Sequence, residues 1–407
     1  MTTGQARFET GIESSAAILP GPPPHWSFSS LREIRTCPRR YALSRASYPD
    51  LWEGPGYPHV PALATIFGHV VHDSLETIVK AVVAAGCESI QSPEAVTVLR
   101  ELGGYTRVIE RAAERRLAGL HGNPRLNDDL RQSIQRNLRG RIADARVQVQ
   151  AYISSAVITP GGKPPREGRS SGAPSPGGRS PLLPGSHAEV TLTASRLRLR
   201  GRVDLMRITE SGAHIVDYKT GSESPSHVEQ LRLYALLWTL DAGANPDRRP
   251  VASLTAAYPG RDTAIPVPGE PELDDIEKQA ATSIEEADAE LAAGEPRAIP
   301  SSQNCSNCDV RHLCDAYWSS VAPDPFDLPD QAKFDCQGMI GVRNGQRIWS
   351  FHPEGVTRRE ILIHAPTGLE LPTGRRVRVL GLRLNADPET RTTVALMNSA
   401  TEVFQLA

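Results

Sequence analysis

The segment from Gly201 to Lys219 predicts a β-hairpin that brings two carboxylates and an amine together. Alternating apolar residues indicate a first strand, residues 211–212 supply a Ser-Gly turn, and a second apolar run leads to Asp217. Cross-strand neighbours lie about 5 Å apart, so folding about this turn places Asp204 close to Asp217. Lys219 shares a face with Asp217, because side chains two residues apart on a strand point the same way.

This group of side chains has two explanations. Carboxylate oxygens are the ligands that Mg²⁺ and Mn²⁺ prefer, and a neighbouring ammonium can orient a water or offset negative charge on a phosphate. The alternative is a surface hairpin with an ordinary Asp–Lys ion pair. The hairpin alone leaves both explanations open.

Two predicted helices flank the hairpin in the sequence. Downstream, a strongly apolar helix carries Gln230 and Tyr234 one turn apart. Upstream, the apolar spacing predicts a helix over 62–85 that contains His72. A lone histidine on such a helix is more often part of a core than a metal ligand, so His72 by itself does not decide between the two explanations.

The ordered set of motifs resembles the RecB-like branch of the PD-(D/E)XK nucleases, which includes the Cas4-type and AddB-type nucleases. The family pattern is a helical His, a GR-hydrophobic-D strand, a D-hydrophobic-K strand and a Q-x3-Y helix. All four parts occur here in this order, and the resemblance covers about residues 25–320. It implies a restriction-endonuclease-like α/β core, and metal-dependent hydrolysis of phosphodiester bonds in DNA.

The resemblance also assigns roles. It implies that Asp204, Asp217, Lys219 and Gln230 are catalytic. The implied ligands of Mg²⁺ or Mn²⁺ are His72, Asp204, Asp217 and the backbone carbonyl of Tyr218. A His in the first motif is typical of members that act from DNA ends, which favours an exonuclease on single strands or ended duplexes.

Further site residues are less specific. Glu189 lies on a strand predicted over 186–193, where related nucleases often carry an acidic residue; it is either another metal ligand or an ordinary strand glutamate. We expect contacts to DNA from Tyr234, unless it only packs, and from Arg232 and Trp349. The many arginines over 92–158 either line a path for phosphates or form a solvated helical face.

The predicted elements form a mixed sheet flanked by helices, with a helical N-terminal part. Besides the hairpin, strands are predicted over 186–193 and 251–258, and helices over 31–44 and 272–291. Composition divides the chain as follows: a flexible tail over 1–24, a nuclease domain over 25–320 with a disordered linker over 160–184, and a C-terminal domain over 331–407.

The cysteines predict a metal site. Six cysteines in a chain without a signal-peptide pattern argue against a disulfide framework. Four of them suit a [4Fe–4S] cluster or zinc, with His312 as a rival ligand, and the resemblance to iron–sulfur members of the family favours the cluster. Cys87 and Cys336 are expected to be ordinary thiols. The four expected ligands are Cys37, Cys305, Cys308 and Cys314.

The segment from Phe334 to Ala407 changes character. Short alternating runs separated by turns predict about five strands, which suits a small, OB-like β-barrel. Gly381 within the longest run suits a sharp bend. Such a barrel would bind single strands through basic residues and Trp349 or Phe351, or it would be a docking module; we favour nucleic acid.

Other classes of protein fit less well. The net charge of −2 does not indicate an overall electrostatic affinity for nucleic acid. No run reaches the roughly 18 apolar residues of a membrane span, so we expect a cytoplasmic protein in DNA repair, recombination or anti-phage defence. The motif G-x4-G-K-[ST] is missing, so a helicase or defence-system partner would be a separate chain. The alternative function is a non-cutting DNA-binding subunit of such a complex, which the complete motif set disfavours.

Overall fold

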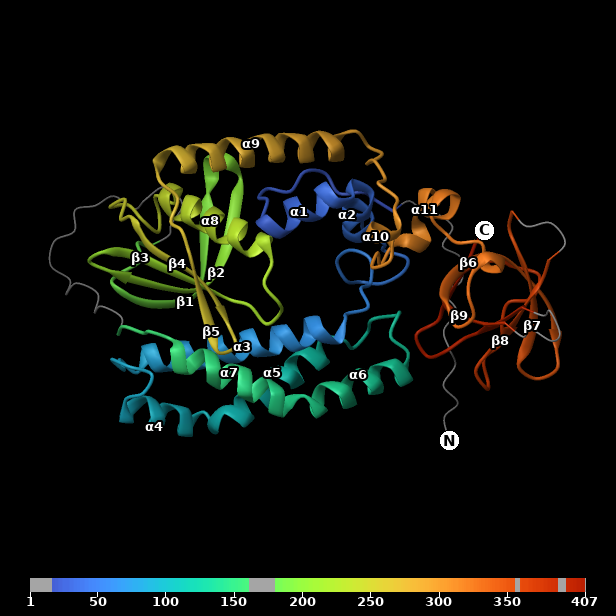
Figure 1. Ribbon diagram of the computed structural model, residues 1–407, viewed down its shortest axis with the longest axis horizontal. Helices are drawn as coiled ribbons and strands as arrows, with labels where there is room; N and C mark the ends of the chain where they lie inside the picture. The colour runs from blue at the N-terminus through green and yellow to red at the C-terminus, as the bar shows by residue number, and fades with distance from the viewer. Residues whose placement is uncertain (1–16, 161–179, 356–358, 387–392, 407) are drawn as a thin grey trace.

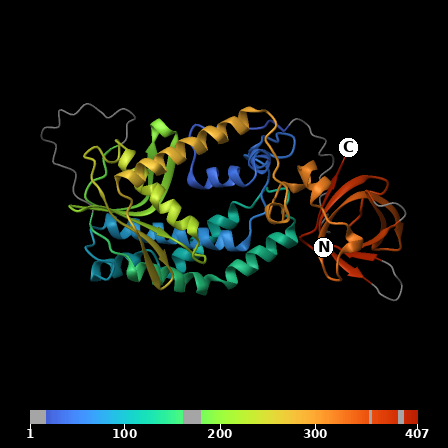
Figure 2. The same ribbon diagram turned by 45° about the horizontal axis from the view of Figure 1, so that its top comes forward.

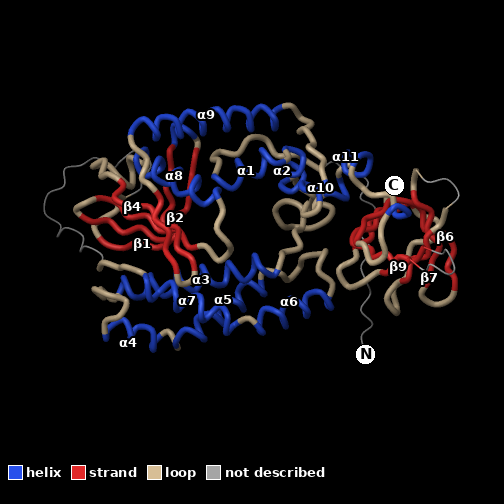
Figure 3. The backbone as a smooth tube through the Cα atoms, in the orientation of Figure 1, coloured by secondary structure: helices blue, strands red, loops and turns tan. Residues whose placement is uncertain are grey.

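The protein consists of a larger α/β body and a smaller body built mainly of strands, which lie end to end (Figures 1 and 3). The computed structural model describes residues 17–160, 180–355, 359–386 and 393–406. Among these residues, no helix combines the length and the apolar character that crossing a membrane requires.

The larger body is built on one mixed sheet, as the sequence predicts. Its strand order is β1-β2-β3-β4-β5, in which β3 and β4 are parallel and all other neighbours are antiparallel. The helix α8 makes the crossover from β3 to β4, because parallel neighbours need a long connection. The bounds are β1 (Gly185–Ala194), β2 (Leu199–Thr209), β3 (Gly212–Tyr218), α8 (Pro225–Leu240), β4 (Val251–Tyr258) and β5 (Arg261–Ile265).

Helices cover both faces of this sheet and bury two separate hydrophobic cores (Figures 1 and 2). One core joins the sheet to α8 and α9, and the other joins it to α3, α5 and α7. The helix α9 then carries the chain from the sheet toward α10. The bounds are α1 (Phe28–Thr36), α2 (Pro38–Arg45), α3 (Leu63–Ala84), α4 (Pro93–Glu101), α5 (Gly104–Ala118), α6 (Asp128–Gly140), α7 (Ile142–Ser155), α9 (Glu270–Ala292), α10 (Ser302–Cys305) and α11 (Asp315–Ser320).

Three local expectations need correction. The single helix expected over 31–44 is two helices, α1 and α2, because Cys37 is extended (φ −164°, ψ 105°) and the residue before a proline avoids helical geometry. The hairpin turn lies at 210–211, since Thr209 pairs with Gly212. The ordered chain begins before residue 25: Ile18 forms a bridge with Ser47.

The linker expected over 160–184 falls mostly on residues 161–179, which lie outside the described residues. The described part that follows is attached to the body: the amide of Leu182 donates to the carbonyl of Ala244 at 3.0 Å, and its side chain packs against the core of the sheet. Residues 180–184 therefore belong to the α/β body and not to a linker.

The smaller body is a closed barrel of five strands with a sixth strand attached. The closed order is β6-β7-β8-β10-β9, and β9 returns to β6; β8 and β10 are parallel. Gly381 has φ 76° and lies where β9 changes partners from β11 to β10, so the expected bend is present. The bounds are β6 (Lys333–Asn344), β7 (Ile348–Pro353), β8 (Ile361–His364), β9 (Arg376–Ala386), β10 (Thr393–Leu396) and β11 (Glu402–Gln405).

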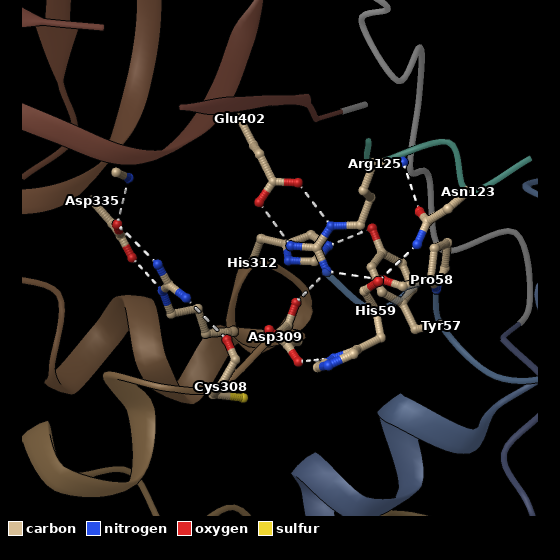
Figure 4. A network of polar contacts seen from close by, with 12 residues as sticks. Tyr57, Pro58, His59, Asn123, Arg125, Cys308, Asp309, His312, Asp335 and Glu402 are labelled. Atoms are coloured by element: carbon tan, nitrogen blue, oxygen red, sulfur yellow. Dashed lines mark hydrogen bonds and ion pairs between the residues drawn. The ribbon is translucent and has the colours of Figure 1, made fainter. Parts of the chain in front are cut away.

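The barrel is held against the α/β body by buried ion pairs, which we call the barrel junction (Figure 4). Arg125, from the loop before α6, donates to both carboxylate oxygens of Glu402 on β11 at 2.7 Å. Its remaining contacts are the carbonyls of Pro58 and Asp309, each at 3.0 Å. Nearby, Arg311 pairs with Asp335 of β6 at 2.5 Å.

Candidate active site and cysteine site

The end of the β2–β3 hairpin opens into a cavity of about 350 Å³ in the larger body, here called the hairpin cavity. Leu205 pairs with Val216, which places Asp204 opposite Asp217 as the sequence predicts. Gly201 is needed for this arrangement, because a Cβ there would lie 2.7 Å from atoms of Tyr234 and Leu237 on α8. The predicted residues that line the cavity are His72, Glu189, Asp204, Asp217, Tyr218, Lys219, Gln230 and Tyr234.

Three of these side chains form a ready-made group of metal ligands. The ligand atoms of His72, Glu189 and Asp204 all lie within 4.8 Å of one another, and His72 Nδ1 is 3.4 Å from Asp204 Oδ1. His72 reaches the site from α3, on the opposite wall from α8. The histidine therefore faces carboxylates and is not enclosed in an apolar core.

Glu189 reaches this group through a distortion of β1. The register pairs Ala188 with Leu205 and Val190 with Val203, and Glu189 between them has φ 58°. Left-handed backbone is unfavourable for a residue with a side chain, and such strain gathers at functional sites. Of the two explanations for Glu189, its left-handed backbone and its place beside His72 and Asp204 favour a ligand over an ordinary strand glutamate.

Asp217 and Lys219 form an ion pair on the floor of the cavity. The backbone amide of Tyr218 donates to Asp204 at 2.6 Å, which fixes that carboxylate. The carbonyl of Tyr218 remains a predicted ligand. Lys219 is held by a second contact, since its ammonium donates to Gln230 Oε1 at 2.7 Å.

Tyr234 extends this chain of hydrogen bonds. Gln230 Nε2 donates to the Tyr234 hydroxyl, which donates to the carbonyl of Arg202; both distances are 2.7 Å. The residue is only 5% exposed. Of the two expectations for Tyr234, a DNA contact or packing, its burial and its hydrogen bonds favour packing.

The cavity holds more negative charge than its cations balance. Burial, and then the charge of Asp204, raise the pKa of Asp217 to about 6 and that of Glu189 to about 7. Burial alone would lower the pKa of His72, but its hydrogen bond to Asp204 and the nearby carboxylates raise it. A divalent cation would relieve this repulsion, so the donor set fits a metal of the Mg²⁺ type.

Two contacts at the cavity were not predicted. Tyr152 of α7 donates its hydroxyl to the carbonyl of Lys219 at 2.7 Å, and nothing in the sequence marks that residue. Arg202 forms an ion pair with Glu189 at the rim. Arg202 belongs to the GR-hydrophobic-D motif, and its position two residues before Asp204 could have indicated it.

Of the other DNA contacts expected from single side chains, the structure corrects that of Trp349 and leaves that of Arg232 as a prediction. Trp349 is 1% exposed and packs in the barrel core, so it cannot stack on a base, and Phe351 is also buried. Arg232 pairs with Glu272 at 2.6 Å and lies outside the hairpin cavity. Most of the arginines over 92–158 have carboxylate or carbonyl partners, for example Arg116 with Asp73 at 2.6 Å, as expected of a solvated face.

The four cysteines of the predicted set meet at one small cavity between α2 and the loop after α10. Cys37, Cys305, Cys308 and Cys314 all line it, although Cys37 is far from the other three in the sequence. The amide of Ile299 donates to Cys37 Sγ at 3.5 Å. Burial raises the pKa of the Cys308 thiol to about 11, so bound metal would have to displace protons there.

His312 is not part of this site. It is 1% exposed, its Nε2 contacts the Tyr57 hydroxyl at 2.6 Å, and its ring stacks on Phe404 of β11 at 3.9 Å. Burial, followed by neighbouring arginines, lowers its pKa well below the usual value. Cys87 and Cys336 lie in other cores. The four predicted cysteines therefore share one cavity that His312, Cys87 and Cys336 do not line, and their role as metal ligands remains a prediction.

Comparison with known proteins gives one match that covers most of the chain: the family model of the PD-(D/E)XK nuclease superfamily matches residues 25–315. No curated protein matches.

Solved structures give only weak likenesses. One is titled "Structure of murine DNA binding protein bound with ds DNA"; it is 9% identical over 54% of this chain and 94% of that chain, with a TM-score of 0.17. Another, "Crystal structure of p204 HINb domain", is 8% identical over 55% of this chain and 96% of that chain, with a TM-score of 0.19. With TM-scores this low, neither likeness carries an argument.

Proposed function

The chain belongs to the PD-(D/E)XK nuclease superfamily, and on this premise we propose that it is a Mg²⁺- or Mn²⁺-dependent deoxyribonuclease. The observation that carries the proposal is the hairpin cavity. There three carboxylates, a histidine and a lysine meet at the end of one hairpin, and two of the carboxylates have raised pKa values.

The residues divide the work as follows. His72, Glu189 and Asp204 would hold the cation, and Asp217 and the Tyr218 carbonyl would complete its ligands. A bound divalent cation polarises the scissile phosphate and makes water a stronger nucleophile. Lys219, fixed between Asp217 and Gln230, would orient the attacking water or offset the charge that develops on the phosphate. Asp204 is kept in place by the Tyr218 amide.

We propose that the enzyme degrades DNA from its ends. The support is the histidine beside Asp204, which by resemblance is typical of family members that degrade or trim DNA from an end. The same resemblance supports cytoplasmic work in repair, recombination or anti-phage defence, with a helicase or a defence protein as partner.

The cysteine site would hold a [4Fe–4S] cluster that joins the two ends of the domain. The support for a cluster is the resemblance to the iron–sulfur members of the family, together with the one cavity that all four cysteines line. The cluster's job would be structural, because phosphodiester hydrolysis moves no electron.

The C-terminal barrel would be OB-like. Its closed strand order, with the third and fifth strands parallel, supports this assignment, and OB-folds bind single strands on one face and in their loops. Because Trp349 and Phe351 are buried, any contact to nucleic acid would come from other residues of the barrel.

Digestion of end-labelled DNA tests the proposal. Linear single-stranded and double-stranded DNA, and their circular forms, are incubated with Mg²⁺, Mn²⁺ or EDTA. We expect nucleotides to be released from linear DNA only when a divalent cation is present, and not by the Asp217→Asn variant. Cleavage of circles would make the enzyme an endonuclease. Binding without cleavage of any substrate would favour the non-cutting subunit.

A further inference from the structure

A second cavity, of about 470 Å³, continues from the hairpin cavity. The two cavities share Lys219, His227 and Gln230. The outer wall comes from α1 and α2, and α1 lies between α8 and α2 in Figure 1. We call this cavity the α1–α2 groove. Its volume lies in the range of pockets that hold small organic ligands, about 300–1,000 Å³.

Two arginines of this wall have no partner. Arg32 of α1 and Arg40 of α2 both line the groove, and within the described part of the chain neither side chain has a hydrogen bond or an ion pair. Arg32 is exposed, whereas Arg40 is half-buried. A partly desolvated guanidinium without an acceptor is unfavourable, so Arg40 in particular indicates a missing anion.

The other arginines of the same two helices are all occupied. Arg35 donates to Ser283, Arg39 pairs with Glu295 at 2.7 Å, and Arg45 pairs with Glu33 at 2.7 Å. Glu33 is the acidic residue of the groove lining, and Arg45 already balances its charge. The two free arginines are thus the two that face the groove, which leaves it with an uncompensated positive charge.

On the floor of the groove, Lys219 is paired with Asp217. Burial, followed by the charges of Lys219 and Arg32, lowers the pKa of His227. The positive charge of the groove therefore comes from Arg32 and Arg40, in a chain whose formal net charge is −2. A local positive field of this kind attracts an anion to the groove, although the whole chain carries no excess of positive charge.

We propose that the α1–α2 groove is a subsite for the sugar–phosphate backbone of the DNA strand being cut, in which Arg32 and Arg40 each hold a phosphate that does not react. The proposal rests on the proposed nuclease function, because continuity with the hairpin cavity places these phosphates next to the scissile one. Guanidinium groups suit this task, since their planar donors match phosphate oxygens. Holding neighbouring phosphates would fix the strand for attack.

The test is binding of a fluorescein-labelled single-stranded 15-mer in EDTA, followed by anisotropy between 50 and 300 mM NaCl. The variants are Arg32→Ala, Arg40→Ala and their double. Arg136 and Arg139 of α6 provide the matched control, because both are exposed and lie outside both cavities. The double Arg136→Ala, Arg139→Ala removes the same charge.

We expect the groove double variant to weaken binding at least tenfold at 150 mM NaCl. The slope of log K against log salt should fall by about 0.7 for each phosphate lost on a single strand. The affinity of the Arg136→Ala, Arg139→Ala double variant should stay within about twofold of that of the wild type. In cleavage assays the groove variants should raise KM more than they lower kcat. The double variant Arg32→Lys, Arg40→Lys should keep most of the slope of log K against log salt.

Several outcomes would overturn the subsite. An unchanged slope in the groove double, an equal loss in the α6 double, or a wild type that does not bind the 15-mer would each do so. Because Arg40 also lines the cysteine site, Arg32→Ala alone must show its own loss of slope. A wild type that binds with the expected slope but never cleaves would overturn the nuclease proposal and leave the groove in place.

Discussion

The hairpin cavity and the barrel junction both bury charged side chains, but they balance them differently. At the junction each buried guanidinium meets a carboxylate through two donors, and its remaining donors meet backbone carbonyls. In the cavity three carboxylates share one ammonium, one histidine and an arginine whose side chain is 60% exposed.

This difference separates the charges that stabilise the fold from the charges that would serve the proposed reaction. Compensated charge at the junction raises the free energy of unfolding only if both partners remain, because removal of one leaves the other buried and unpaired. Uncompensated charge in the cavity raises carboxylate pKa values, and a bound cation would relieve it. Substitutions should therefore affect activity at one region and stability at the other.

The largest effect is expected for Asp204→Ala, Asp217→Ala and Lys219→Ala. Each should lower Mg²⁺-dependent cleavage by about 10³-fold or more, since each removes a metal ligand or a group that offsets charge in the transition state. Thermal unfolding of the metal-free variants should stay close to that of the wild type. An Asp217→Ala enzyme that cleaves at the wild-type rate would show that the assigned site is wrong.

Removal of the cysteine ligands should act on stability and metal content together. Protein purified without air should contain about four irons per chain if the cluster is of the [4Fe–4S] type, and Cys37→Ser should lose them and become unstable or insoluble. Cys87→Ser and Cys336→Ser are the controls and should keep the iron. Stoichiometric zinc in colourless protein would refute the cluster but keep the four-cysteine site.

At the junction, Arg125→Ala should lower the free energy of unfolding by about 3 kcal/mol, because Glu402 loses its partner in a site where the Arg125 side chain is 3% exposed. Urea unfolding measures this. Arg107→Ala breaks an exposed pair with Glu110 at 3.5 Å and should change stability by about 0.5 kcal/mol or less. Equal effects at both positions would contradict the contrast between the two regions.

The junction also changes the expectation for a truncated chain. Deletion of residues 331–407 removes Glu402 from Arg125 and Phe404 from His312, so the remaining body should be less stable than the full chain and weaker in DNA binding. Melting temperatures of both proteins test this. Equal melting temperatures would show that the barrel is an independent unit, as composition alone suggests.

The smallest effect on stability is expected for Glu189→Gln. The substitution removes a carboxylate whose pKa is raised to about 7, so metal-free protein should melt at the same or a slightly higher temperature. Cleavage and the thermal shift caused by Mg²⁺ should both fall, because a ligand is lost. A lower melting temperature with unchanged metal response would make Glu189 a structural residue.

Much of the site followed from short-range pattern. The alternation of apolar residues predicts the two hairpin strands, so Asp204, Asp217 and Lys219 were expected to meet, although the turn lies one residue earlier than predicted. Gln230 and Tyr234 had to share a helix face. The α/β fold followed from the ordered motifs, and the barrel from its alternating runs. The individual strands and helices depend on a period of two or 3.6 residues that the sequence displays directly, whereas the arrangement of the α/β core was implied by the resemblance of the ordered motifs.

Other features depended on packing between distant segments. Whether Trp349 faces DNA or the barrel core depends on which face of β7 closes the barrel, and alternation cannot say which face is inside. The break at Cys37, by contrast, could have been read from Pro38. Glu189 joins the ligand group because the pairing of β1 with β2 places it opposite Asp204.

By itself, then, the sequence determined the hairpin and the helix that supports it, because local periodicity set those positions, and the resemblance to the family supplied the expected roles of these residues and of the four cysteines. The tertiary structure alone decided which arginines stay unpaired in the α1–α2 groove and which form ion pairs with Glu295, Glu33 or Glu402. The physical reason is that a guanidinium is paired or free according to what the fold brings within about 4 Å of it, and those partners lie as many as 277 residues away in the sequence.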